Sequence, residues 1–123
     1  MTATDRALAL TRAAAAAAED KLGTDLVAFD VTEQLAITDV FLIVTADSDR
    51  QVGAVVDAVE ERLREEFDAK PVRREGDRQN RWVLLDYLEL VVHVQHLEER
   101  EFYALERLWR DCPRIALEVE GQR

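Results

Sequence analysis

Asp47 and Asp49 follow an apolar run and form the pattern in this sequence with the clearest capacity for chemistry. Two carboxylates at the end of a strand can hold a magnesium ion for phosphoryl transfer, the chemistry of a magnesium-dependent nucleotidyltransferase. Such enzymes also need a glycine-serine turn that opens a helix around the triphosphate, and none of the four glycines is followed by serine. We therefore favour the alternative that these aspartates begin a helix, where capping and the helix dipole favour acidic residues.

The two histidines, the cysteine and the serine do not form a recognisable catalytic or metal-binding set. His93 and His96 are three residues apart, a spacing that points strand side chains to opposite faces, and Cys112 is distant in the chain. Ser48 and Cys112 also lack the local sequences that surround a catalytic nucleophile. We expect no catalytic activity, no metal and no cofactor.

Aromatic residues among charged ones are the more promising binding candidates. Trp and Tyr are over-represented at the centres of protein interfaces, where polar rims surround them. Trp82 and Tyr87 flank an apolar run, at positions from which a side chain can reach the surface. Trp109 has the helical spacing of a core residue and is interpreted as core, whereas the pattern around Trp82 leaves surface and core equally open.

The length and composition indicate one soluble globular domain. The chain has 123 residues, 48% hydrophobic and 34% charged, which fits a single domain over 1–123 with a core at about 5–110 and a tail at 111–123. The longest apolar stretch near the middle, 40–44, is too short to span a membrane, and the alanine run at 13–18 is interpreted as helix and not as a signal peptide. One cysteine cannot form an internal disulfide, so we expect a cytoplasmic protein.

The net charge limits the partners. A formal charge of −10 disfavours direct binding to nucleic acid, which requires clustered Lys and Arg. An acidic protein can still act beside RNA by docking on a basic protein, because opposite potentials speed the encounter. Charge that serves only solubility is the alternative, and charge by itself does not separate the two.

Periodicity predicts the elements of the first half of the chain. Residues 5–22 read as an alanine-rich helix that ends at a left-handed cap on Gly23, and 25–31 and 40–46 read as strands. Ser48 followed by Gln51 has the form of a capping box, and apolar residues then recur at helical spacing to 67.

The second half reads as three strands and a helix. A short, charged strand at 72–74 should lie near a sheet edge, followed by a loop at 75–81 and by two antiparallel strands at 81–86 and 89–95. The consecutive apolar residues at 83–85 and 90–92 predict strands covered on both faces. A helix at 98–110 should bury a stripe, and the apolar residues 115–119 have no assigned role. The stripe consists of Phe102, Leu105, Leu108 and Trp109.

The predicted order is helix, strand, strand, helix, three strands, helix, which is α-β-β-α-β-β-β-α. Only the strand-helix-strand connection through 52–67 is of the parallel type. We therefore expect an α/β fold with a mixed sheet of about five strands, covered by helices.

Several separated segments resemble the ribosomal silencing factor family RsfS, also called the Iojap family. They are residues 37–39, 45–52, Trp-Val-Leu-Leu-Asp-Tyr at 82–87, Val-Val-His-Val at 91–94, and 99–109. The similarity spans roughly 7–109, and several motifs in the same order make it a specific signal. The resemblance implies a nucleotidyltransferase-like mixed α/β fold without catalytic activity, and often a homodimer.

The resemblance also implies a function. Members of this family are expected to bind the large ribosomal subunit through ribosomal protein fourteen at the intersubunit face. The bound factor then sterically prevents the small subunit from joining, which represses translation when nutrients run short and links the family to ribosome biogenesis.

Mapped onto this sequence, the resemblance implies three groups of residues that bind the ribosomal protein. An aromatic and aliphatic anchor flanked by carboxylates would match a basic partner. The strand group is Trp82, Leu84, Asp86 and Tyr87; the group assigned to the neighbouring strand-to-helix turn is Asp39, Ser48, Arg50 and Gln51; the rim group is Glu99, Arg100, Glu101 and Tyr103.

Four positions depart from the family pattern. Val40 replaces a usual aromatic, Asp47 stands where the turn is commonly Gly-x-Ser, Leu88 replaces a usual glycine in a strand turn, and Gln95 replaces a bulky apolar residue. Most of these are structural positions, so they bear on loop geometry more than on binding, and Leu88 is the most consequential of them.

Overall fold

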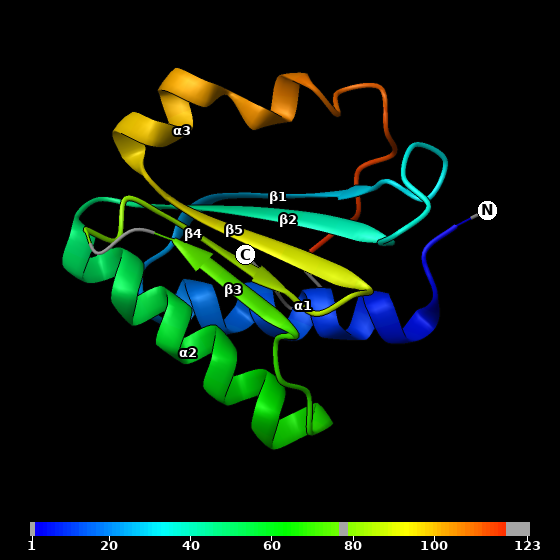
Figure 1. The fold of residues 1–123 in the computed structure, drawn as a ribbon, viewed down its shortest axis with the longest axis horizontal. Coiled ribbons are helices and arrows are strands. Elements are labelled where there is room, and N and C mark those ends of the chain that lie inside the picture. The colour runs from blue at the N-terminus through cyan, green and yellow to red at the C-terminus, as the bar shows by residue number, and fades with distance from the viewer. Residues whose placement is uncertain (1, 77–78, 118–123) are drawn as a thin grey trace.

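Figure 1 shows a computed structural model of the protein, which describes residues 2–76 and 79–117. The elements confirm the predicted order, with a short 3-10 helix added near the end. Among the described residues, no helix is both long enough and apolar enough to cross a membrane. The elements are α1 (Asp5–Asp20), β1 (Thr24–Asp30), β2 (Val40–Ala46), α2 (Asp49–Phe67), β3 (Arg73–Gly76), β4 (Trp82–Asp86), β5 (Leu90–His96), α3 (Leu97–Tyr103) and η1 (Leu105–Arg107).

The strands form one mixed five-stranded sheet in the order β1-β2-β5-β4-β3. The neighbours β2 and β5 are parallel, and the other neighbouring pairs are antiparallel. Helix α2 therefore carries the chain from β2 past β5 and β4 to β3 at the edge, as predicted for this charged strand. All residues of β3 are exposed, and charges on such an edge discourage pairing with another chain.

Helices α1 and α2 cover one face of the sheet, which we call the helical face, and α3 lies over the other, the α3 face (Figure 1). Strand alternation sends one set of β2, β4 and β5 side chains into an apolar cluster beneath α1 and α2. The many buried alanines of α1 allow close approach to the sheet. The strand residues in this cluster are Ala28, Val40, Leu42, Val44, Ala46, Val83, Leu85, Leu90, Val92 and Val94.

Gly23 does not adopt the predicted left-handed conformation. Helix α1 ends at Asp20, two residues earlier than predicted, and the left-handed residue is Leu22 at φ 67°. The N–H groups of Leu22 and Gly23 donate to the carbonyls of Glu19 and Ala18. Gly23 is required for close approach instead, because a Cβ there would lie 2.8 Å from Val44 Cγ1.

Strand β4 is covered on one face only, so the prediction of two-sided coverage is wrong there and correct for β5. Val83 and Leu85 are buried on the helical face, whereas Trp82, Leu84 and Asp86 are half-buried on the α3 face. The reason is that α3 is too short to reach across β4, and apolar residues on both faces of β4 gave no sign of this.

The predicted helix at 98–110 breaks at Ala104, which adopts φ 46° and ends α3. The change of direction brings Leu105 and Trp109 against a second apolar cluster, around Phe29 on β1, and leaves Phe102 and Leu108 80% and 71% exposed. The predicted stripe is therefore half wrong, since it assumed one uninterrupted helix.

The segment after the helices has a structural role that its sequence did not reveal. The Ile115 N–H donates to the Ala28 carbonyl, and the Asp30 N–H donates to the Pro113 carbonyl. This segment therefore covers the free edge of β1, and Ile115 and Leu117 contact the main core cluster. The rest of the predicted tail, 118–123, lies outside the described residues.

Candidate functional site

An aromatic patch lies on the α3 face where the sheet is left open. Trp82, Leu84 and Tyr103 line a hollow of about 360 Å³ together with Glu75, Gly76 and Glu99; these six residues are the aromatic patch below. The ring centroids of Trp82 and Tyr103 are 4.8 Å apart, and Tyr103 contacts the exposed ring of Phe102 at 4.9 Å. The patch thus combines an aromatic floor with carboxylates at its margin, a composition typical of protein-binding sites.

A buried histidine holds the indole of Trp82. Trp82 Nε1 donates a hydrogen bond of 3.2 Å to His93 Nδ1. Burial lowers the pKa of His93 to about 4, so the ring is neutral near pH 7 and its Nδ1 can accept. Trp82 is neither fully exposed nor part of the core: its side chain is half-buried, with the indole N–H bound to the core and the rest of the ring at the hollow.

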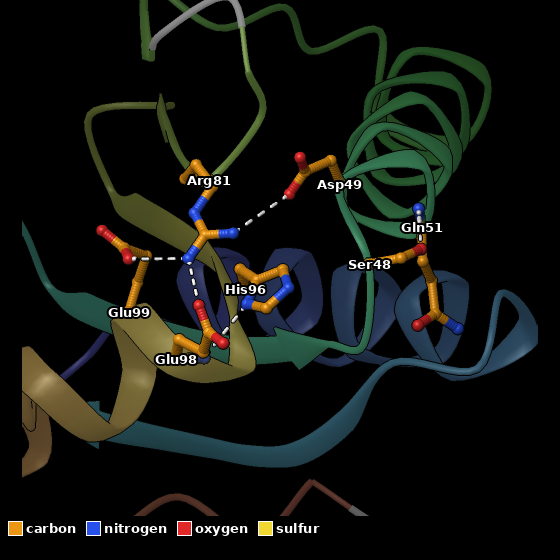
Figure 2. Close-up of polar contacts among 7 residues, drawn as sticks. All are labelled: Ser48, Asp49, Gln51, Arg81, His96, Glu98 and Glu99. Carbon is orange, nitrogen blue, oxygen red and sulfur yellow. Dashed lines mark hydrogen bonds and ion pairs between the residues drawn. The ribbon is translucent and has the colours of Figure 1, made fainter.

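Arg81 joins the starts of two helices beside the patch (Figure 2). Its guanidinium lies 2.6 Å from Glu98 and 3.3 Å from Glu99 at the start of α3, and 3.7 Å from Asp49 at the start of α2. The hydrogen bond with Glu98 raises the pKa of Arg81 and lowers the pKa of Glu98. Three carboxylates around one guanidinium leave this corner negatively charged.

Sequence reasoning missed Arg81 and Glu75 as members of this region. Arg81 precedes β4, and its carbonyl accepts from the His96 N–H just before α3, so the β4–β5 register brings it to the acidic pair Glu98 and Glu99. That register could have indicated the contact, because two adjacent antiparallel strands place the start of one beside the end of the other. Glu75 faces the hollow only because β3 pairs with β4, opposite Leu84.

Two of the residues predicted at the start of α2, Ser48 and Gln51, form hydrogen bonds within the fold. Ser48 Oγ accepts from the Gln51 N–H, which confirms the predicted cap. The other half of the box differs: Gln51 Oε1 accepts from the Asp47 N–H, and its Nε2 donates to the carbonyls of Lys21 and Leu22. Gln51 is thus a link between α1 and α2, while Arg50 beside it is exposed.

Asp39 does not lie with Ser48, Arg50 and Gln51, so their predicted grouping is wrong. The whole length of β2 separates Asp39 from Ser48, since β2 runs from Val40 to Ala46. Asp39 Oδ2 accepts from the Thr4 N–H, near the turn between β4 and β5. The prediction treated the two ends of one strand as a single turn.

Tyr87 and Arg100, both predicted to contact a partner, are buried. Tyr87 is 6% exposed because it continues the alternation of Val83 and Leu85 into the helical face, and burial raises the pKa of its hydroxyl. Arg100 is 7% exposed and donates to Thr45 Oγ1 at 2.6 Å and to Glu106 at 3.2 Å, which fastens α3 to β2. Their expected exposure is therefore wrong, whereas Glu101 is exposed as expected.

Asp47 and Asp49 have roles at the start of α2. Asp49 faces Arg81, and the backbone of Asp47 is bound by Gln51, in line with the interpretation as a helix start. His96 Nδ1 accepts from the Glu98 N–H at the start of α3. Within the ranges 2–76 and 79–117, no group of three or more His, Cys, Asp and Glu side chains is arranged to hold a metal ion.

Comparison with known proteins identifies the family. The sequence model described as ribosomal silencing factor during starvation matches residues 4–123. The ribosomal silencing factor RsfS of Bacillus subtilis is 40% identical over 81% of this chain and 84% of its own, and that of Halalkalibacterium halodurans is 39% identical over 83% and 86%.

Solved structures agree with these sequence matches. A crystal structure of a Chromobacterium violaceum protein has a TM-score of 0.79 at 31% identity, covering 92% of this chain and 94% of that one. A Bacillus halodurans structure has a TM-score of 0.76 at 35% identity, covering 93% and 100%. The chain therefore belongs to the RsfS family of ribosomal silencing factors.

Proposed function

We propose that this chain binds the large ribosomal subunit through ribosomal protein fourteen and sterically blocks the small subunit from joining. Three relatives that bear the name ribosomal silencing factor are 33–40% identical to it over most of its length. The observation that carries the proposal is the aromatic patch, which offers an open, half-buried indole for a partner. We infer that it acts where nutrients are short, as the family description indicates.

The chemistry of the aromatic patch fits a basic protein partner. Trp82, Leu84 and Tyr103 supply an anchor of the kind that dominates binding energy at interfaces. Glu75 and Glu99 at the margin, on a chain of net charge −10, would attract a positively charged surface and orient it. The same charge disfavours direct contact with the phosphates of ribosomal RNA.

A steric mechanism requires only this binding patch and a rigid body that it holds in place. Blocking requires a rigid body that occupies the intersubunit face, and the five-stranded sheet with its two long helices provides one. No reacting group is required, so inhibition should follow occupancy of the large subunit. Five of the predicted residues outside the patch are exposed or half-exposed, as is Gln51, and all six remain predicted contacts to be tested after the patch itself. The five are Asp39, Ser48, Arg50, Asp86 and Glu101.

Cosedimentation with purified large subunits tests the proposal. Trp82→Ala combined with Glu75→Lys should reduce the affinity more than tenfold, because an interface tryptophan often contributes about 2 kcal/mol or more. Asp57→Lys, an equal charge change on the exposed side of α2, is the matched control and should bind normally. Undiminished binding of the patch variant would contradict the proposed surface, and wild-type protein that fails to bind the large subunit would contradict the function.

We also infer that the chain can form a homodimer. Phe102 and Leu108 are the most exposed large apolar side chains of the α3 region and are the first candidates for such a contact. Light scattering of the wild type and of Phe102→Ser combined with Leu108→Ser tests this, since a dimer through α3 should dissociate in the variant.

A further inference from the structure

His93 occupies a position where an apolar side chain would be expected. It lies on the central strand β5, paired with Ile43 of β2 and Leu84 of β4, and is 6% exposed. Its neighbours Val92 and Val94 point into the helical face, so the His93 ring lies on the α3 face, against the rings of Phe41 and Trp82. A polar ring in such a place requires a physical reason.

The hydrogen bonds of His93 show what the ring provides and what it lacks. Nδ1 accepts from the Trp82 indole, which places the proton of the neutral ring on Nε2. Nε2 is buried and has no hydrogen-bond partner among the residues that the structure describes. A buried N–H without a partner destabilises a fold, so His93 weakens the core in which it sits. Its positive contribution is a single acceptor for one indole.

That acceptor fixes an otherwise adjustable side chain. Trp82 is the first residue of β4, next to the hairpin loop, and its indole is held between His93 at its N–H and the Tyr103 ring at 4.8 Å. The ring centroids of Phe41 and His93 are 5.2 Å apart, and those of Phe41 and Trp109 are 5.1 Å apart. The imidazole is therefore itself held in place by packed rings. An anchor held in its bound orientation loses less conformational entropy when a partner docks.

We propose that His93 is a positioning residue of the aromatic patch, and that its Nδ1 holds the Trp82 indole in the orientation that the partner recognises. This inference rests on the proposed function, which supplies the partner. His93 does not touch the partner itself; it acts through Trp82. The bond between the two rings can be observed without the ribosome, and its use in docking can be measured with the large subunit.

A spectroscopic measurement tests the hydrogen bond between His93 and Trp82, and a binding measurement tests its use in docking. His93→Phe keeps a ring and removes the acceptor, so the Trp82 indole N–H resonance should move further than that of Trp109 in a ¹⁵N-correlated NMR spectrum. The same variant should weaken binding to purified large subunits about fivefold, the size of one lost hydrogen bond. His93→Asn, whose side-chain oxygen lies close to the position of Nδ1, should restore part of both signals.

A double-mutant cycle separates positioning from general damage to the core. In a Trp82→Phe background, which has no indole N–H, His93→Phe should cause no further loss of affinity. Val91→Ala, on the same face of β5 and two residues away from His93, is the control that should lower stability and leave the affinity unchanged.

The outcomes distinguish this inference from the proposed function. Equal losses from His93→Phe in both backgrounds, or normal binding of His93→Phe where Trp82→Ala fails to bind, would overturn the role of His93 and leave the function intact. Wild-type protein that fails to bind the large subunit would overturn the proposed function, and the docking role of His93 with it.

Discussion

The two faces of the sheet are built on different principles. The helical face is closed by α1 and α2 and filled with Val, Leu and Ala side chains that are almost wholly buried. The α3 face carries the polar residues His93, Gln95 and Thr45 on its central strands, and the buried Arg100 binds Thr45 there. This face leaves Trp82 and Leu84 half-exposed. One face of the sheet is thus specified by apolar contacts, whereas the other adds particular polar contacts to a smaller apolar cluster.

The difference indicates where stability and function reside. Burial of apolar area stabilises a fold at about 25 cal/mol per Å² without regard to direction, so the helical face tolerates exchange among apolar residues of similar volume. Hydrogen bonds and ion pairs are directional and contribute little net stability, yet they orient side chains. We expect substitutions on the helical face to change unfolding and substitutions on the α3 face to change binding.

The largest test uses two adjacent leucines of β4. Leu85→Ala, on the helical face, should reduce the free energy of unfolding by about 2–5 kcal/mol, because it leaves a cavity in a closed core. Leu84→Ala, on the half-open face, should cost roughly 1 kcal/mol or less, since the side chain is already partly in water. Urea unfolding monitored by circular dichroism measures both.

The same pair should show the reverse order in ribosome binding. Leu84→Ala should weaken cosedimentation with large subunits, and Leu85→Ala should bind normally at temperatures where it remains folded. Two leucines with equal effects on both measurements would remove the distinction between the faces.

The next test uses the histidine of the α3 face. Burial lowers the pKa of His93 to about 4 in the folded protein, from 6.5 in the unfolded chain. Between these values the unfolded chain binds a proton there and the folded protein does not, so stability is lost as the pH falls below 6.5. The free energy of unfolding should drop by roughly 2 kcal/mol between pH 7 and pH 5 from this residue.

His93→Phe isolates that contribution, because it keeps every carboxylate and the other histidine. The difference between the wild-type and variant stability curves should change through this pH range and stay flat above pH 7. A difference that is constant from pH 7 to pH 5 would mean that His93 titrates normally.

The helical face was also the face that the sequence predicted well. The bounds of β2 and the capped start of α2 were correct, because buried apolar residues repeat at the period of their element and Ser48 supplies a local cap. The break of α3 at Ala104 was missed because the apolar spacing continues through it, and the contact of Arg100 with Thr45, 55 positions away in the chain, was missed with it. Periodicity carries no information on such contacts.

The candidate site shows the same division between what local sequence predicts and what depends on contacts between distant segments. The resemblance indicated Trp82, Leu84, Glu99 and Tyr103, which the structure brings together, but also Tyr87 and Arg100, which it buries. A motif identifies residues but does not show on which face of the sheet their side chains lie. That depends on the alternation of side chains along each strand and on where α3 packs. The acceptor for the Trp82 indole required the β4–β5 register, which no local pattern contains.

A test with a smaller expected effect removes a polar side chain from the α3 face and introduces one on the helical face. Neither side-chain polar atom of the fully buried Gln95 has a hydrogen-bond partner among the described residues, so Gln95→Met should be neutral or stabilising by up to about 1 kcal/mol. Val94→Thr, the neighbour on the helical face, introduces a hydroxyl without a partner and should cost about 1–3 kcal/mol. Thermal unfolding measures both, and a Gln95→Met variant as unstable as Val94→Thr would show that the amide is satisfied.

The smallest effect on the free energy of unfolding is expected at the turn that joins β4 to β5, at the end of the sheet and outside both faces. Leu88 adopts φ 73°, a conformation that glycine accepts without a steric penalty, and its N–H donates to Asp86 Oδ1. Leu88→Gly removes the strain but adds freedom to the unfolded chain, and we expect a net gain of about 0.5 kcal/mol. Leu88→Ala keeps the strain, so a gain as large from alanine as from glycine would trace the effect to the removal of the 57% exposed leucine side chain and not to the backbone.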